Sequence, residues 1–348
     1  MGLLKKHVRV LIVDDSLVAR EMLASILSSD PDIEVVGQAK DGVEAVAMVA
    51  QLRPDLVTMD IHMPKLDGLR ATEKIMAYTP TPILVVSSSV RGEGVGSAFD
   101  ALAFGALEVI KKPEPREWVD LQRIGREVIR KVKVLANIKV ITHIGGRREQ
   151  QSAPAVPIGR RTRKRNVVAI GSSTGGPSAL LAVLGRLPVD IKVPVLVAQH
   201  IADGFVPGLV GWLNAGCAID IVVAEEGVSP QPGTVYFATT GSNMTVSGGE
   251  IRFRTPGRGQ LYIPSADTLF ESVARFYGKN SVAVLLTGMG ADGAAGMKVL
   301  HDVGAVTIAQ DEATCVVFGM PKSAIDLGGA SLVLGVNDIA AAVVDAIG

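Results

Sequence analysis

The sequence has little cysteine and no long apolar run. Only Cys217 and Cys315 occur in 348 residues, so neither a disulfide framework nor a four-thiolate metal site can form within one chain. No stretch approaches the roughly 18 consecutive apolar residues of a membrane-spanning helix. Residues 1–15 join a short apolar run to two aspartates, which fits neither a secretory signal nor a spanning helix. We therefore expect a cytoplasmic protein, and a hydrophobic content of 48% argues against disorder.

The chain also lacks net charge, yet its charges are unevenly distributed. Residues 1–122 carry a net charge of −5, residues 123–165 carry +11 and residues 166–348 carry −6. At about 150 residues per domain, the length predicts two domains. We predict one domain over residues 1–122, a helix extension and basic linker over 123–165, and a second domain over 166–348. The linker's basic cluster at 160–165 is typical of a solvated tether, with contact to an acidic partner or membrane surface as the alternative.

Residues 1–122 alternate short apolar runs with helix-length amphipathic segments. This pattern predicts a doubly wound parallel sheet of the (βα)5 type. The predicted strands are Val8–Val13, Ile33–Ala39, Asp55–Met59, Ile83–Val86 and Leu107–Ile110. The predicted helices are Ser16–Leu27, Val43–Gln51, Gly68–Tyr78, Gly94–Phe104 and residues 116–138.

The same α/β alternation resumes at Val167 and predicts a second doubly wound, mainly parallel domain. Its predicted strands are Val167–Ile170, Val193–Ala198, Ile219–Val223, Ser281–Leu286 and Ala305–Ala309. Its predicted helices are Ser178–Gly185, Ala266–Tyr277, Ala291–Asp302 and Asp338–Ile347. The segments Thr234–Ala238, Met244–Val246 and Ile251–Arg254 predict an antiparallel hairpin or meander.

Polar residues follow four of the predicted strands in the first domain. Asp14 and Asp15 follow the first strand, Asp60 the third, Ser87 the fourth and Lys112 the fifth. Carboxyl ends of parallel strands meet at one edge of the sheet, so we expect these side chains to lie together. Three carboxylates suit a hard divalent cation such as Mg²⁺, and the lysine and serine suit an anion beside it. The set favours phosphoryl transfer to a carboxylate over the simpler account of helix caps and turns.

These positions carry a resemblance to the receiver domain of response regulators. The matching motifs are VDDS at 13–16, MDIHMPKLDG at 59–68, VVSSS at 85–89 and KKP at 111–113. The resemblance implies that Asp60 is the phospho-acceptor and that Asp14, Asp15 and the backbone carbonyl of His62 join it in binding Mg²⁺. It also implies that Ser87 and Lys112 contact the phosphoryl group. Val109 departs from the family, in which many receivers carry a switch aromatic there.

Serine, histidine and aspartate follow three predicted strands of the second domain. Ser172 and Ser173 lie in a glycine-rich turn after the first strand, His200 follows the second, and Asp292 ends the turn 287–292. The serine turn has neither the lysine of a P-loop nor the G-x-S-x-G pattern of an α/β-hydrolase. Taken singly, His200 reads as a turn residue and Asp292 as a helix cap. Taken together, they favour a Ser-His-Asp triad that hydrolyses an acyl bond.

This domain resembles the catalytic domain of the chemotaxis methylesterase family. The motifs are AIGSSTGGPSAL, VLVAQHIADGF, YIPSADTLFESVA, LTGMGADGAAGM and AQDEATCVVFGMPKSAI. The resemblance implies Ser173 as nucleophile, His200 as general base and Asp292 as its orienter. It also places Thr174 and the backbone N–H of Met289 near the serine, the latter as an oxyanion donor.

Two turns depart from the family pattern. Asn243 stands where a histidine is common, and Ile201 and Ala202 replace two prolines after His200. We expect both turns on rim loops that do not touch the triad.

The two resemblances together imply a phosphorylation-activated protein-glutamate methylesterase. It would demethylate glutamate γ-methyl esters on the cytoplasmic helices of chemoreceptors, deamidate glutamines at the same site, and take its phosphoryl group from a chemotaxis histidine kinase. The resemblance implies Mg²⁺ for phosphorylation, no cofactor for the esterase, and a monomer that can be recruited to membrane receptor clusters. The alternatives are a regulator with a DNA-binding output or one with an inactive hydrolase fold. The net charge of −6 on the second domain and the absence of a basic recognition helix argue against specific nucleic-acid binding.

Overall fold

The computed structural model describes residues 7–88, 93–113, 118–140 and 165–348. The chain divides into two compact units, Met1–Arg148 and Glu149–Gly348. Most of the predicted basic linker lies outside the described residues, so the boundaries at 122 and 165 stay a prediction. Arg165, the last member of the basic cluster, is buried and donates a hydrogen bond to the carbonyl of Lys279. This arginine therefore packs as part of the second unit.

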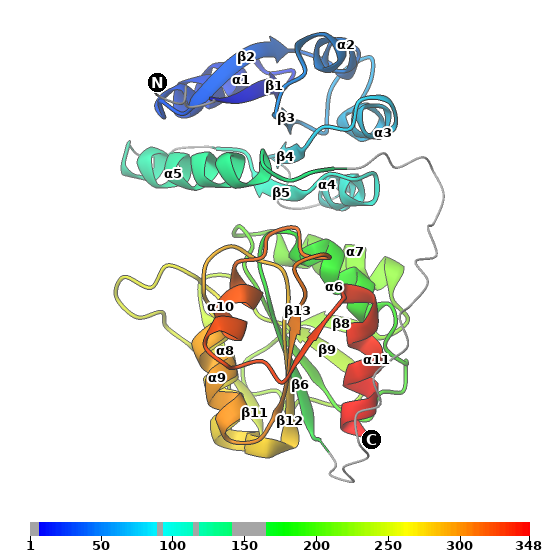
Figure 1. Cartoon of the computed structure of the whole chain (residues 1–348), viewed down its shortest axis with the longest axis vertical. Helices are drawn as coiled ribbons and strands as arrows, with labels where there is room; N and C mark the ends of the chain where they lie inside the picture. Colours follow the sequence, from blue (N-terminus) through cyan, green and yellow to red (C-terminus); the bar gives the residue numbers. More distant parts are fainter. Residues whose placement is uncertain (1–6, 89–92, 114–117, 141–164) are drawn as a thin grey trace. The chain divides into compact units, whose positions relative to one another are not determined.

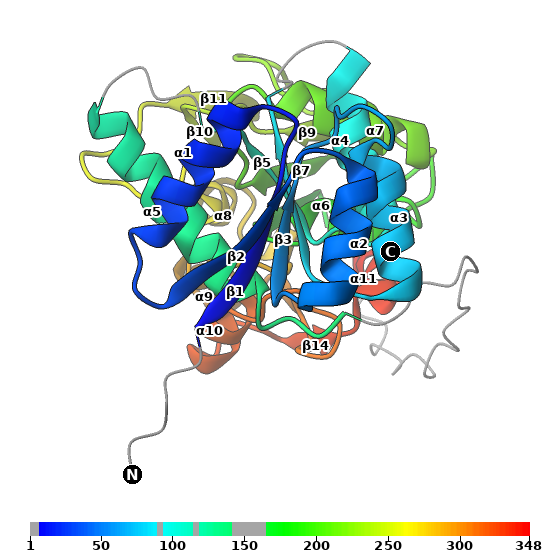
Figure 2. The same ribbon diagram turned by 90° about the horizontal axis from the view of Figure 1, so that it is seen from above.

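The first unit contains a five-stranded parallel sheet in the order β2-β1-β3-β4-β5. Helices α1 and α5 cover one face, and α2, α3 and α4 cover the other (Figure 2). The strands are β1 Val8–Val13, β2 Ile33–Ala39, β3 Leu56–Met59, β4 Ile83–Ser87 and β5 Glu108–Lys111. The helices are α1 Leu17–Ser28, α2 Gly42–Leu52, α3 Gly68–Tyr78, α4 Glu93–Ala103 and α5 Trp118–Leu135.

Short polar side chains start three of these helices at the positions where backbone N–H groups lack partners. Ser16 accepts a hydrogen bond from the backbone of Ala19, Asp41 from Glu44, and Asp67 from Arg70. Each cap therefore stabilises the start of its helix.

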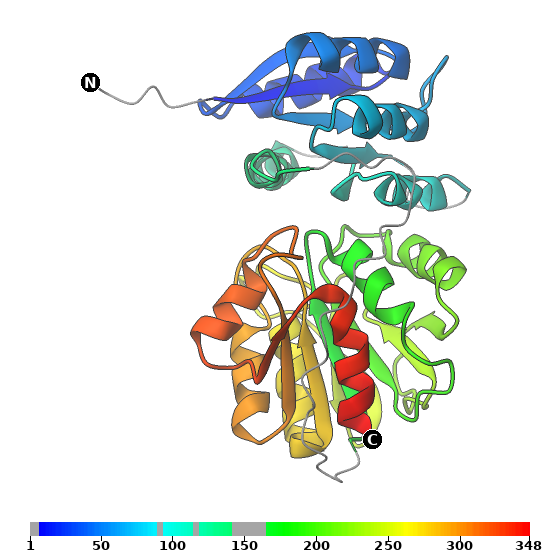
Figure 3. The same ribbon diagram turned by 45° about the vertical axis from the view of Figure 1, so that its right-hand side comes forward.

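The second unit contains a seven-stranded sheet in the order β14-β13-β12-β6-β7-β9-β8, in which every pairing is parallel. Helices α6, α7 and α11 cover one face, and α8, α9 and α10 cover the other (Figure 3). The strands are β6 Val167–Ser172, β7 Val195–Gln199, β8 Asp220–Val223, β9 Thr234–Phe237, β12 Ser281–Leu285, β13 Val306–Gln310 and β14 Leu332–Leu334. The helices are α6 Gly176–Leu184, α7 Val206–Gly216, α8 Ala266–Tyr277, α9 Ala294–Asp302, α10 Met320–Asp326 and α11 Val336–Ile347, with the short 3₁₀ helix η1 Gly278–Asn280.

A separate antiparallel hairpin joins β10 Asn243–Ser247 to β11 Glu250–Arg254. The prediction of a hairpin is confirmed for these two strands, but the inclusion of Thr234–Ala238 in the meander was wrong. That segment forms β9, whose residues Val235 and Tyr236 are both buried, as a strand covered on both faces of a parallel sheet requires. The hairpin packs against α8, and Met244 of β10 and Phe270 of α8 both belong to one hydrophobic core cluster.

The α/β class predicted for both units is confirmed. In the described part of the chain, no helix combines the length and apolar character needed to cross a membrane. Figure 1 shows α8 and α9 side by side on one face of the second sheet, a pairing on which the site depends.

Candidate functional site

The first group of predicted residues meets at the carboxyl edge of the first sheet. Asp14 and Asp60 follow β1 and β3, Ser87 ends β4, and Lys112 follows β5. The Lys112 Nζ lies 2.7 Å from Asp14 Oδ2 and 3.0 Å from Asp60 Oδ2, and all three side chains are largely buried. The other oxygen of Asp60 accepts a hydrogen bond from the N–H of Ile61 at 2.8 Å. At this edge the Asp60 carboxylate is held at both oxygens: the backbone N–H of Ile61 binds Oδ1, and the ammonium of Lys112 binds Oδ2.

The carboxylates of Asp14, Asp15 and Asp60 form an acidic pocket suited to a cation. One oxygen from each residue lies within 4.8 Å of the other two. Carboxylate oxygens are the donors that Mg²⁺ prefers, so this set fits the metal that the sequence predicted. The His62 side chain is exposed, and the role of its backbone carbonyl as a ligand stays a prediction.

Burial and charge act in opposite directions on this cluster. Burial is the largest influence on Asp60 and raises the pKa of its carboxyl, while the charge of Lys112 partly offsets it and that of Asp14 adds to it. Burial lowers the pKa of Lys112, but hydrogen bonds and charges of Asp14 and Asp60 outweigh it, so the net pKa is raised. The lysine therefore stays protonated and keeps a positive charge where an anion would bind.

Ser173 lies in the turn between β6 and α6. Its N–H donates to the carbonyl of Thr287 at 3.0 Å, and its carbonyl accepts from the N–H of Gly176 at 2.8 Å. Gly175 adopts a φ of 76°, which a residue with a side chain rarely tolerates. The serine is 8% exposed at the N-terminal end of α6. The backbone therefore holds this hydroxyl at a helix start, as the sequence pattern predicts.

Gln199 joins the turn of Ser173 to the turn of His200, and sequence reasoning missed it. Its amide nitrogen donates to the carbonyls of Ser173 at 2.9 Å and His200 at 2.8 Å. Its amide oxygen accepts from the hydroxyl of Ser172 at 2.6 Å, so that serine is occupied in structure. The available signal in the sequence was a glutamine at the end of an apolar strand, directly before the histidine.

His200 and Asp292 meet at hydrogen-bond distance. The Nε2 of His200 lies 2.7 Å from Asp292 Oδ2. The Nδ1 is buried and makes no hydrogen bond to any described residue. It is therefore not hydrogen-bonded to the hydroxyl of Ser173. Catalytic hydrogen bonds are often long in the free enzyme and shorten once substrate binds. The free ring nitrogen is therefore the one available to take a proton.

The N-terminus of α8 holds Asp292 in place. Asp292 Oδ1 accepts from the Ser265 hydroxyl at 2.8 Å and the Asp267 N–H at 3.2 Å, and Oδ2 accepts from the Ala266 N–H at 2.6 Å. Burial raises the pKa of Asp292, but the hydrogen bond and charge of His200, with the donors from Ala266 and Ser265, outweigh it and lower the net pKa. Asp292 therefore remains a carboxylate that can orient the imidazole.

The aromatic ring of Tyr262 stacks on His200, with ring centroids 4.8 Å apart and planes 10° apart. Nothing in the spacing of the sequence predicted this contact.

Asn243 does not lie on a rim loop, as the sequence had predicted. That expectation was wrong, because Asn243 begins β10 and is 3% exposed. Its side chain accepts a hydrogen bond from the N–H of Ser265 at 2.9 Å. The residue that departs from the family pattern is therefore buried and bound to Ser265, whose hydroxyl contacts Asp292.

Thr174 and Met289 lie on the two turns that surround Ser173. Thr174 is buried, and its carbonyl accepts from the hydroxyl of Thr287 at 3.0 Å. A Cβ added to Gly288 would lie 2.7 Å from the Cβ of Ser173, so the turn that leads into Met289 approaches the serine closely. The role of Met289 as an oxyanion donor stays a prediction.

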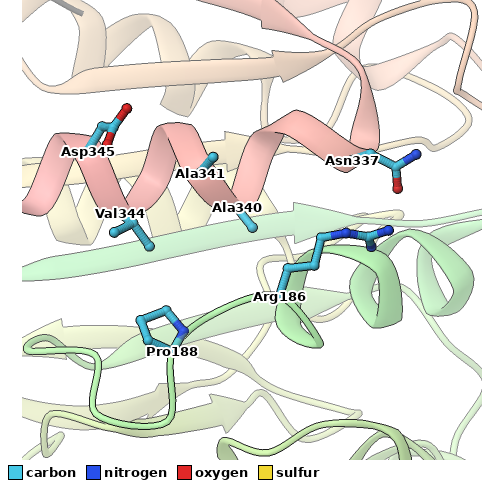
Figure 4. A pocket seen from close by; sticks show the side chains of 7 residues that line it. All are labelled: Arg186, Pro188, Asn337, Ala340, Ala341, Val344 and Asp345. Atoms are coloured by element: carbon cyan, nitrogen blue, oxygen red, sulfur yellow. The ribbon is translucent and has the colours of Figure 1, made fainter. Parts of the chain in front are cut away.

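A pocket of about 420 Å³ opens elsewhere on the second unit, between α11 and the segment that follows α6 (Figure 4). None of the predicted site residues lines it. Its lining residues are Arg186, Pro188, Asn337, Ala340, Ala341, Val344 and Asp345.

Comparison with known proteins identifies both units. The family model for the CheB methylesterase matches residues 168–343, and that for the response regulator receiver domain matches residues 10–121. A protein-glutamate methylesterase/protein-glutamine glutaminase of Anaeromyxobacter dehalogenans is 44% identical over 96% of this chain and 95% of its own. A relative of the same name from Syntrophus aciditrophicus is 44% identical, with 96% of each chain covered. The solved catalytic domain of Thermotoga maritima CheB methylesterase is 34% identical over 53% of this chain and 99% of its own, with a TM-score of 0.49.

Proposed function

The chain belongs to the CheB methylesterase family, with a receiver domain ahead of the catalytic domain, and from this premise we propose that it is a phosphorylation-regulated protein-glutamate methylesterase. Its substrates are glutamate γ-methyl esters on the cytoplasmic helices of chemoreceptors, and its products are methanol and glutamate. The same site deamidates glutamine. The observation that carries the proposal is the His200–Asp292 hydrogen bond of 2.7 Å, which leaves Nδ1 of His200 free.

In the first half of the reaction, the Ser173 Oγ attacks the ester carbonyl and its proton passes to Nδ1 of His200. The Met289 N–H stabilises the oxyanion, with Thr174 on the opposite turn. The C–O bond to methanol breaks, and His200 returns the proton to the leaving oxygen. In the second half, water attacks the acyl-serine with His200 again as base, which frees the glutamate carboxyl and Ser173. Asp292 keeps its charge and holds the ring throughout.

The receiver unit is the regulatory part of the proposal. A histidine kinase supplies the phosphoryl group, which Asp60 accepts through its carboxylate. Asp14, Asp15, Asp60 and the backbone carbonyl of His62 would hold Mg²⁺, whose charge neutralises the transferring phosphoryl group. Lys112 and Ser87 contact that group once it is attached. The phosphorylated receiver then releases a restraint on the catalytic unit.

A direct test incubates the full chain with methylated receptor membranes and measures methanol together with the mass of receptor peptides. We expect methanol and peptides that have lost their methyl groups in equal amounts. Receptor with glutamine at the same positions should yield ammonia. Unchanged receptor in both assays, with a chain that is folded by circular dichroism, would contradict the proposed function.

A DNA-binding output is not favoured. Residues 166–348, which form the second sheet and its helices, carry a net charge of −6, and an acidic fold of this kind does not suit specific DNA binding.

A further inference from the structure

Asn243 is a buried amide whose oxygen and nitrogen both have hydrogen-bond partners. Its Oδ1 accepts from the Ser265 N–H at 2.9 Å and the Gln260 Nε2 at 3.2 Å, and its Nδ2 donates to the Gln260 Oε1 at 2.9 Å. An amide that is buried without partners costs about 1–3 kcal/mol, so this arrangement allows few alternatives. One side chain therefore fixes both Ser265 and Gln260.

The Ser265 branch leads to the orienting carboxylate. With its N–H on Asn243, Ser265 directs its hydroxyl to Asp292 Oδ1 at 2.8 Å. The same hydroxyl accepts a hydrogen bond from the N–H of Thr268 and thereby caps α8. The first N–H of that helix, from Ala266, donates to the other oxygen of Asp292. A shift of Ser265 would therefore move the carboxylate that holds His200.

The Gln260 branch leads to the imidazole ring. Gln260 Nε2 donates to the Tyr262 carbonyl at 3.1 Å, and its Oε1 accepts from the Gly257 N–H at 3.1 Å. These bonds shape the loop that carries Tyr262, whose ring stacks on His200. A change in this loop would therefore remove Tyr262 from the face of the imidazole on which it stacks.

We propose that Asn243 is a positioning residue for the reaction, which orients the His200–Asp292 pair through Ser265 on one side and Gln260 on the other. The proposal rests on the proposed function, because it concerns the same site. A base must hold its geometry to a fraction of an ångström, and a displacement of 1 Å can cost about 100-fold in rate. Asn243 therefore acts on the rate of the chemical step and not on substrate binding.

Ser272 provides the matched control, because it also fastens β10 to α8. Its hydroxyl accepts from the Val246 N–H at 3.0 Å and donates to the Leu269 carbonyl at 2.7 Å, and it is 2% exposed. Ser272 thus shares the structural role of Asn243 without a bond to Ser265 or Gln260.

The experiment compares Asn243→Ala with Ser272→Ala on methylated receptor membranes, together with the thermal unfolding of each. We expect both variants to unfold at lower temperature. Only Asn243→Ala should lower kcat, by about 10- to 100-fold, with KM within about 2-fold of the wild type. Equal effects of the two substitutions on kcat, or a loss confined to KM, would overturn the proposal.

Two narrower variants test the branches separately and serve if Asn243→Ala does not fold. Ser265→Ala keeps its N–H on Asn243 but loses the hydroxyl on Asp292, and Gln260→Ala detaches the Tyr262 loop. Each should lower kcat about 10-fold or more. Adding Asn243→Ala to Ser265→Ala should cost less than the product of the two losses, because both lie on one path. Full multiplication of the losses would contradict a shared path.

A second readout separates this proposal from the proposed function. A fluorophosphonate reacts with an activated serine without any receptor: the Ser173 Oγ forms a bond to phosphorus, His200 takes the hydroxyl proton, and the P–F bond breaks to release fluoride. Asn243→Ala should slow the labelling of Ser173 more than Ser272→Ala does. Slowed labelling in a chain whose wild type releases no methanol would uphold the positioning role and reject the substrate. Equal labelling in both variants would reject the positioning role.

Discussion

At the residue scale, the charge of Asp292 decides how the imidazole of His200 is used. Asp292 has a lowered pKa because its bonds to His200, Ala266 and Ser265 outweigh the effect of burial. A carboxyl with a depressed pKa stabilises the folded state above its unfolded pKa of about 3.8, and that contribution is lost as the pH falls further. The orienting charge is therefore present throughout the neutral range.

Asp292→Asn should lower kcat by about 10⁴-fold, as the same change does in other triads, because an amide favours the wrong tautomer of the histidine. The measurement is the rate of ester hydrolysis at neutral pH. The control is Asp190→Asn, at an exposed residue paired with Lys192, and it should leave kcat unchanged. A loss below about 10-fold for Asp292→Asn would mean that another group orients His200.

The residues that the sequence predicted and those that it missed differ in kind. His200 and Asp292 follow strand ends, and parallel topology alone brings strand ends together. Tyr262, Gln260 and Asn243 belong to a loop and a hairpin outside the large sheet. Their approach to the site depends on tertiary packing, which no local pattern encodes.

At the element scale, the start of α6 controls the two catalytic turns through a single glycine. A Cβ on Gly176 would lie 2.0 Å from Gln199 Oε1, the amide that joins the Ser173 and His200 turns. Helix α7 supplies a contrast, because Gly211 has no heavy atom within 4 Å of its added Cβ and is exposed.

Gly176→Ala should cost about 1–3 kcal/mol of unfolding free energy and lower the esterase rate, because Gln199 must move. Gly211→Ala should instead stabilise the chain by up to about 1 kcal/mol, because alanine favours a helix. Denaturant unfolding and the hydrolysis rate of both variants check this pair. Equal stability of the two variants would show that Gln199 does not constrain the turn.

Helices α8 and α9 meet at carboxylates that bind each other's N-termini. Asp292, just before α9, accepts from the start of α8, and Asp267 in α8 accepts from the Gly296 N–H of α9 at 2.7 Å. Burial is the largest influence on Asp267 and raises the pKa of its carboxyl. The hydrogen bond from the Gly296 N–H lowers that pKa and the charges of Asp292 and Glu271 raise it, so the net pKa is about 6.

Because the folded pKa of Asp267 is above its unfolded value of 3.8, this residue makes the fold less stable as the pH rises from about 4 to 6. Asp267→Asn keeps an oxygen for Gly296 and removes the charge. The variant should therefore unfold at a higher temperature than the wild type at pH about 8, with a smaller difference at pH about 5. Thermal unfolding at both values tests this, and a gain that is larger at the acidic value would contradict it.

The pattern of alternation predicted most elements at this scale, and its failures have physical causes. Helix α7 contains a proline and three glycines, which reads as a loop, yet Leu209 and Leu213 bury one face against the sheet. Strand β9 lies near a true hairpin, and only the pairing with β7 reveals its parallel direction. Chain direction within a sheet is a tertiary property, so local periodicity does not report it.

At the scale of the whole molecule, the net charge of zero is the sum of two acidic stretches, residues 1–122 and 166–348, and the basic segment 123–165 between them. Each unit has its own sheet, and each sheet carries its own set of residues at the strand ends. Regulation requires that phosphorylation of one unit changes the activity of the other. Couplings of this kind are typically 1–3 kcal/mol, or about 5- to 150-fold.

Asp60→Asn should abolish activation without altering the basal rate, because the acceptor carboxylate lies in the receiver unit and not at the triad. In the wild type, a small phosphodonor with Mg²⁺ should raise the rate of methanol release by about 5-fold or more. In the variant, the rate should be the same with and without the donor. An Asp60→Asn chain that the donor still activates would show that the phosphoryl group acts elsewhere.

The most direct test of the triad compares two adjacent serines. The Ser172 hydroxyl donates to Gln199, whereas Ser173 is the serine that we propose as the nucleophile. We predict that Ser173→Ala keeps its fold and releases no methanol above background from methylated receptor membranes, while Ser172→Ala is less stable but still releases methanol. Full activity in Ser173→Ala, or loss of activity only in Ser172→Ala, would contradict the account.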